Sequence, residues 1–129
     1  MSLADSDRRL ARVFAACVLL AAALLACKGG SKQKCATTVT LDGKPGQGTG
    51  DGRDESVASA CLDWCAQHDP VVDQAHSAWK ATPAGQASKQ SKFSEMWSVP
   101  NGSQLLQECK ARCLGKVKPD PAAARVNCT

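Results

Sequence analysis

The chain has 129 residues, of which 43% are hydrophobic, and a formal charge of +4 at pH 7. It contains eight cysteines but only two phenylalanines, three tryptophans and no tyrosine. The short length excludes a division into several domains, and the few aromatic residues exclude a large aromatic core. Because a chain this short buries a limited share of its surface, the cysteine count favours one small domain stabilised by disulfide bonds.

The N-terminus has the residue order of a bacterial export signal. Three arginines at positions 8, 9 and 12 precede residues 13–26, which are apolar throughout. This apolar run is shorter than the roughly twenty residues that a transmembrane helix needs. Basic, apolar and then small residues in this order predict a signal peptide over residues 1–26.

The apolar run ends in Leu24-Leu25-Ala26-Cys27, which resembles the lipobox of bacterial lipoproteins. The resemblance covers only the first 27 residues; it implies a diacylglycerol on the thiol of Cys27, cleavage after Ala26 and an acylated amine. Several acyl chains anchor a protein firmly, whereas a single chain binds marginally. Lys28 stands in place of the aspartate that retains enteric lipoproteins at the inner membrane, so we expect the cell envelope and its outer membrane. The alternatives are an ordinary secretory peptide and an uncleaved anchor.

Residues 27–34 predict a flexible lipidated tether, because glycine, serine and lysine dominate them. Residues 36–41 favour an extended strand, and a turn at Asp42-Gly43 follows. Since a lone strand is marginally stable, we expect an extended segment that lies on the helices.

Residues 43–52 contain five glycines and predict a flexible loop. The spacing is not a dinucleotide-binding fingerprint, because Asp51 and Arg53 occupy positions that the motif needs for other residues. The segment also lacks a phosphate-binding loop and a series of calcium ligands.

Two matched cysteine pairs predict a helical hairpin. Cys61 and Cys65 are separated by three residues, as are Cys109 and Cys113. Residues four apart lie on one face of a helix, about 6 Å apart along its axis. A disulfide needs Cβ atoms about 4 Å apart, so a bond within a pair would distort its helix. Bonds between antiparallel helices are easier, which predicts Cys61–Cys113 and Cys65–Cys109.

The first side of the hairpin is expected over residues 54–68, with Asp54 or Ser56 as its cap. Its apolar and cysteine residues recur with helical spacing: Val57, Cys61, Trp64, Cys65 and His68. Asp69-Pro70 predicts the cap and first turn of a second helix over residues 70–80.

The rest of the chain is expected to contain one more long helix. Residues 81–92 predict a mobile loop, and a short apolar turn with Phe93, Met96 and Trp97 follows. The second side of the hairpin then begins with Asn101 or Ser103 as its cap and ends before Gly115. The tail is expected to be irregular until Cys128.

The four hairpin cysteines also have a spacing that suits zinc, because zinc ligands come at gaps of two to four residues. Export favours disulfides over this alternative. With Cys17 removed and Cys27 lipidated, Cys35–Cys128 follows by elimination. The twin Cys-x3-Cys layout resembles the hairpins of small mitochondrial intermembrane-space proteins, from which we take only the hairpin geometry.

The expected fold is therefore mainly α: a small disulfide-stapled antiparallel helical hairpin with an extended N-terminal segment and an irregular C-terminal tail. It forms one disulfide-rich domain over residues 35–129. Residues 42–73 carry seven acidic side chains and residues 80–118 carry seven basic ones. Attraction between antiparallel neighbours explains this division, and a basic face for anionic lipid or polysaccharide is the alternative.

No catalytic set, cofactor or resident metal is predicted. His68 and His76 are about 12 Å apart along a continuous helix, too far to share one metal, although Asp73 and His76 share a face. The leading hypothesis is a lipid-anchored cell-envelope protein that acts as a non-enzymatic binding or structural module. Its expected partners are the membrane, through the lipid, and an envelope protein or an anionic glycan or lipid surface, but no nucleic acid. The alternative is a thiol–disulfide or metal-handling envelope protein.

Overall fold

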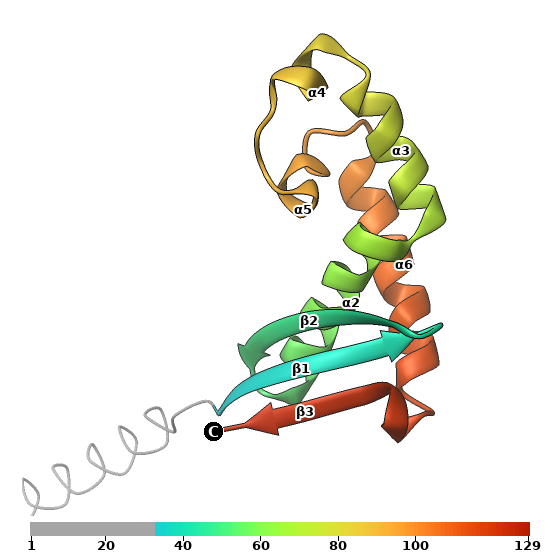
Figure 1. The fold of residues 1–129 in the computed structure, drawn as a ribbon. Coiled ribbons are helices and arrows are strands. Elements are labelled where there is room, and N and C mark those ends of the chain that lie inside the picture. Colours follow the sequence, from blue (N-terminus) through green and yellow to red (C-terminus); the bar gives the residue numbers. More distant parts are fainter. Residues whose placement is uncertain (1–32) are drawn as a thin grey trace, which may run out of the picture. The chain divides into compact units, whose positions relative to one another are not determined.

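A three-stranded antiparallel sheet and two long disulfide-linked helices form the centre of the molecule. The computed structural model describes residues 33–129. The expected signal peptide over residues 1–26 and the lipidation of Cys27 lie outside this range. In chain order the elements are β1 (Lys34–Leu41), β2 (Lys44–Asp51), α2 (Arg53–His68), α3 (Pro70–Lys80), α4 (Pro83–Ala87), α5 (Lys92–Glu95), α6 (Gly102–Val117), the 3-10 helix η1 (Pro121–Ala123) and β3 (Ala124–Cys128) (Figure 1).

The expectation of a mainly α hairpin is wrong, because both ends of the described chain join a sheet. The strand order is β2-β1-β3, so the N-terminal segment is the central strand. The tail, expected to be irregular, contributes β3, in which Val126 lies opposite Thr37. The prolines at positions 119 and 121 precede the strand and leave its backbone free to pair. The fold is mixed α/β.

The glycine-rich segment is strand β2, and the prediction of a flexible loop there is wrong. Asp42 and Gly43 have φ angles of 53° and 73° and make the two-residue turn from β1. Gly48 faces α2 so closely that a Cβ atom would collide with the backbone nitrogen of Ala60 and lie 2.5 Å from the carbonyl carbon of Ser59. Alternate glycines therefore let a helix lie directly on the strand backbone.

Helix α2 packs against both the sheet and α6, and two disulfides join the helices. The bonds are Cys61–Cys113 and Cys65–Cys109, with Cα separations of 5.7 and 6.0 Å, and Cys35–Cys128 joins β1 to β3. The first two bonds are those expected from the spacing, and the third is the one expected by elimination. The four hairpin sulfurs lie in the core beside buried Val39, Ala60, Val72, Met96 and Leu106.

Some helix caps and boundaries follow the sequence, and others differ from it. Asp69 caps α3 by accepting a hydrogen bond from the Val72 N–H (3.1 Å), as predicted. The cap expected for α2 is wrong, because Gly52 occupies that position; Asn101 occupies the cap position of α6, as one of the two predictions had it, but its side chain makes no capping hydrogen bond. Helix α6 also continues through Gly115.

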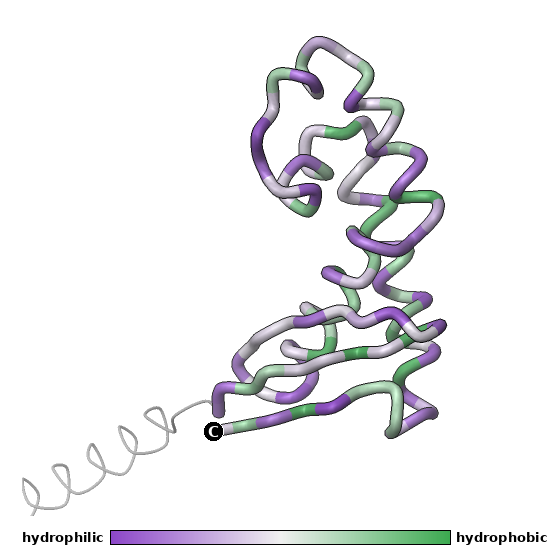
Figure 2. Tube along the Cα trace, in the orientation of Figure 1, coloured by the Kyte–Doolittle hydropathy of each residue, from purple (hydrophilic) through white to green (hydrophobic). Residues whose placement is uncertain are grey.

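The segment between α2 and α6 forms a distal lobe, defined here as residues 69–101. It contains α3, α4 and α5 and lies at the opposite end of α2 from the first turn of that helix (Figure 1). The expected loop over residues 81–92 contains α4, and the expected apolar turn overlaps α5. Figure 2 shows hydrophobic and hydrophilic positions alternating along β3, as on a strand with one buried face.

Candidate functional site

The candidate site lies on the side of the sheet away from α2. Cys35, Thr37 and Val39 of β1 are buried toward α2, so the alternate residues of β1 face the other way. Residues directly opposite each other on paired strands share a face, which adds residues of β2 and β3. We define the outer sheet face as the central part of this side, beyond the terminal pair Lys34 and Asp51; it consists of Ala36, Thr38, Thr40, Pro45, Gln47, Thr49, Arg125 and Asn127. Figure 1 shows this face in front and α2 behind it.

The outer sheet face is rich in hydrogen-bonding side chains that have no partner in the described part of the chain. Six of its eight side chains are threonine, glutamine, asparagine or arginine. Arg125 is the one charged residue among these eight, and the only other charged side chains on this side of the described sheet, Lys34 and Asp51, form an ion pair with each other at its end. Elsewhere the polar side chains are often engaged, as in the ion pair between Lys92 and Asp73 (2.6 Å). The free groups on this face therefore remain available to a ligand.

A shallow, open hollow of about 790 Å³ lies over this face. Its lining includes Thr38, Gln47, Thr49, Arg125 and Asn127. The volume is within the range of ligand sites, but such sites are mostly apolar, whereas this surface is polar. The geometry suits a polar ligand that lies across the strands rather than an apolar molecule that is enclosed.

The two histidines have separate structural partners. The ring nitrogen Nε2 of His68 donates to the carbonyl oxygen of Pro45 (2.9 Å), and that of His76 donates to Oε2 of Glu95 (2.6 Å). Asp73, expected to share a face with His76, pairs with Lys92. Among residues 33–129 no three histidine, cysteine or acidic side chains are placed to hold a metal ion.

Glu95 is a buried carboxylate that the sequence reasoning missed. Hydrogen bonds from His76 and from the Lys80 ammonium (3.0 Å) lower the pKa of Glu95 to about 2. Both donors belong to α3, so the carboxylate ties α5 to α3. The signal in the sequence was an acidic residue within the short apolar turn that contains Phe93 and Met96.

Glu95→Gln is expected to lower the melting temperature at neutral pH, because it removes the charge that both donors contact. The folded-state pKa of Glu95 lies below its ordinary value, so the ionised carboxylate stabilises the fold above about pH 4.5. That contribution disappears as the pH falls toward 2. Thermal melts between pH 7 and pH 2 should show the melting temperatures of the wild-type protein and of Glu95→Gln converging as the pH falls. Glu108→Gln, in an exposed residue, is the control, and a pH-independent difference would contradict this role for Glu95.

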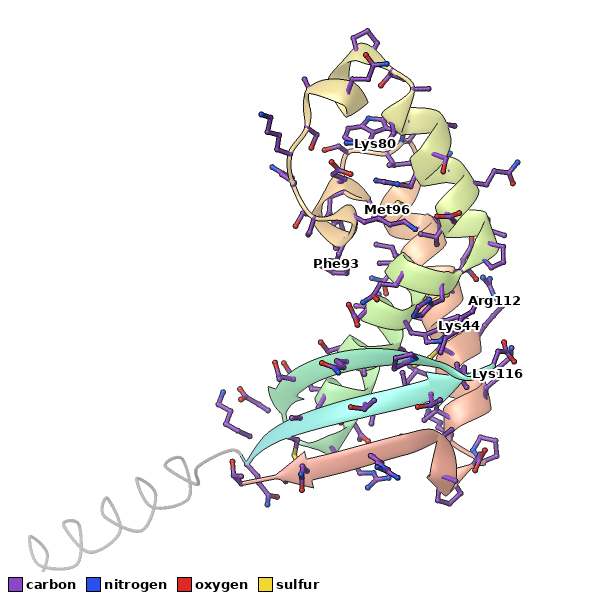
Figure 3. The ribbon with its side chains drawn as sticks, in the orientation of Figure 1. Lys44, Lys80, Phe93, Met96, Arg112 and Lys116 are labelled. Atoms are coloured by element: carbon purple, nitrogen blue, oxygen red, sulfur yellow. A yellow bond between two sulfur atoms is a disulfide. The ribbon has the colours of Figure 1, made fainter. Side chains whose placement is uncertain are left out.

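Among the described residues, the expected attraction between the acidic stretch 42–73 and the basic stretch 80–118 is limited to two ion pairs, one of which is Asp73–Lys92. Arg112 of α6 pairs with the α3 cap Asp69 at 3.2 Å. Lys116 has no ion pair with any described residue. Figure 3 places Arg112 and Lys116 on one side of the helices and Phe93 on the other. The basic residues of α6 are therefore largely solvated.

All six cysteines of the described region are in disulfides, and five of their side chains are 3% exposed or less. Cys128 is half-buried. No helix within residues 33–129 is long and apolar enough to cross a membrane. Comparisons of the chain with models of protein families, with curated proteins and with solved structures found no match.

Proposed function

We propose that the protein is a lipid-anchored, non-enzymatic binding module of the bacterial cell envelope that holds an anionic glycan on its outer sheet face. The observation that carries this proposal is the set of unpartnered hydrogen-bonding side chains around Arg125. Because the charges of Lys34 and Asp51 cancel in their ion pair, Arg125 leaves this side of the sheet with a net positive charge, which attracts an anion.

The chemistry of these side chains matches a hydroxyl-rich polymer. Threonine hydroxyls and the amides of Gln47 and Asn127 both donate and accept hydrogen bonds, as sugar hydroxyls do. The guanidinium of Arg125 binds a carboxylate or phosphate in a bidentate, charge-assisted manner. Alternate residues of a strand lie about 7 Å apart and neighbouring strands about 4.8 Å apart, so the groups form a regular grid. Such a grid suits repeated contacts with an extended chain.

The lipobox and the short tether support a position close to the membrane. Residues 28–33 span at most about 20 Å even when fully extended. The structural partners of His68 and His76 support a binding role over acid–base catalysis, because each ring already holds two parts of the fold together. The deeply buried sulfurs favour this proposal over thiol–disulfide exchange, which needs an accessible sulfur.

Arg125→Gln is expected to weaken binding of the membrane-extracted protein to an acidic polysaccharide by about tenfold, the effect of losing one charge-assisted hydrogen bond. Lys116→Gln makes the same charge change on α6 and is expected to have little effect. Binding of the wild-type protein should also fall as salt rises. Equal binding by both variants would contradict the glycan site.

The same preparation tests the anchor by intact mass. The expected mass begins at an acylated Cys27, and six thiols appear only after reduction. An unmodified N-terminus would remove the anchor from the proposal, and free thiols or a bound metal would favour the thiol or metal-handling alternative.

A further inference from the structure

The outer edge of β3 presents an unpaired backbone. The Thr129 N–H donates to the carbonyl oxygen of Lys34 (2.8 Å), which fixes the alternation of hydrogen bonds between β1 and β3. The N–H and C=O groups of Ala124, Val126 and Cys128 therefore point away from β1. Within residues 33–129, no side chain or loop makes a hydrogen bond to them, and Figure 1 shows no element beyond this edge.

The opposite edge of the sheet is largely capped by side chains of α2, although no hydrogen bond to the outward Thr49 backbone is present among the described residues. The Gln47 N–H donates to Oδ2 of Asp63 (2.8 Å), and the Asp51 N–H donates to Oε2 of Glu55 (3.1 Å). Pro45, also on this edge, has no N–H, and its carbonyl oxygen accepts from His68. Proteins cap or pair exposed strand edges because such edges are templates for other strands. The contrast marks the β3 edge as the one left open for pairing.

We propose that β3 pairs antiparallel with β3 of a second copy of the chain, about a twofold axis at Val126. In this register Val126 lies opposite the partner's Val126, and Ala124 lies opposite the partner's Cys128. The five-residue strands then overlap along their whole length. Every outward N–H and C=O of both strands acquires a partner, and the product is a six-stranded sheet.

Avoidance of like charges favours this register and permits an identical partner. Arg125 lies opposite the partner's Asn127 on the outer sheet face, so no like charges meet. A slip of two residues in one direction would place Arg125 opposite the partner's Arg125, and like charges directly opposite each other destabilise a sheet. The half-buried Val126 side chains meet on the inner face and gain contact there. The strand is thus complementary to itself.

Charge variants at position 127 test the pairing. Sedimentation equilibrium of the full-length protein in detergent micelles measures its mass and therefore the fraction of dimer. Asn127→Lys places a lysine opposite Arg125 at two symmetry-related positions of the dimer. The repulsion is expected to raise the dimer dissociation constant roughly fivefold or more. Asn127→Glu is expected to lower it by a similar factor. Gln107→Lys makes the same charge change as Asn127→Lys on an exposed part of α6 and should leave the constant unchanged.

Val126→Pro removes the central outward N–H, which makes no hydrogen bond within the chain, and is expected to abolish the dimer while the monomer stays folded. A wild-type protein that is monomeric at all concentrations would overturn the proposal. So would equal shifts for the lysine and glutamate variants at position 127, which remain informative if the proline variant fails to fold.

Discussion

Replacing the four hairpin cysteines by alanine is expected to unfold most of the protein at room temperature. Cys61–Cys113 and Cys65–Cys109 close loops with sequence separations of 52 and 44 residues. Together they contribute about 6 kcal/mol in the chain-entropy model, since the second bond adds less once the first is closed. Small domains have a total stability of about 5–15 kcal/mol, so the loss is a large part of it. Urea denaturation followed by circular dichroism measures the effect.

Replacing Cys35 and Cys128 by alanine is the matched control for this result. The strands that this bond joins are already paired, and the hairpin bonds shorten the loop that it closes. A smaller loss of stability is therefore expected. Equal losses in the two variants would contradict the view that the hairpin bonds dominate the stability.

Gly48→Ala is expected to destabilise the protein by about 3 kcal/mol, near the upper end for overpacked cores. The added methyl group would meet backbone atoms of Ser59 and Ala60, which have no rotamer with which to move aside. Strand β2 would have to separate from α2. The midpoint of urea unfolding measures the loss.

Gly115→Ala provides a control of opposite sign. Gly115 lies within α6, and a Cβ atom there would meet no atom within 4 Å. Alanine is the better helix former, so a gain of about 0.5–1 kcal/mol is expected. If both alanine variants had the same midpoint, the close packing of β2 on α2 would be wrong.

The helices and the disulfides were predictable because their signals are local. Four-residue spacing places Cys61 and Cys65 on one face of a helix, and Asp69 followed by proline is a typical start of a helix. The pairing of β1 with β3 joins residues more than eighty positions apart, such as Thr37 and Val126. Composition carries little information about such pairs.

The sequence of β2 was misinterpreted because glycine disfavours strands when it is considered alone. Gly46, Gly48 and Gly50 occupy every second position, however, and small residues of α2 such as Ala60 face them. Glycines at every second position of β2, together with small residues on α2, were the sequence signal for a strand packed closely against a helix. The outer sheet face was not predictable, because its membership depends on which strands pair. Glu95 was missed because its partners come from another helix.

The capped edge of β2 limits the size of any assembly. A sheet with two open edges can add further copies of the chain at both edges and grow into a fibre. Here Asp63, Glu55 and His68 of the same chain occupy the outward groups of Gln47, Asp51 and Pro45, which lie on both sides of Thr49 along the outer edge of β2. A sheet that grows through β3 therefore terminates after two copies, with a closed margin at each end. Many copies could crowd together on one surface without forming filaments.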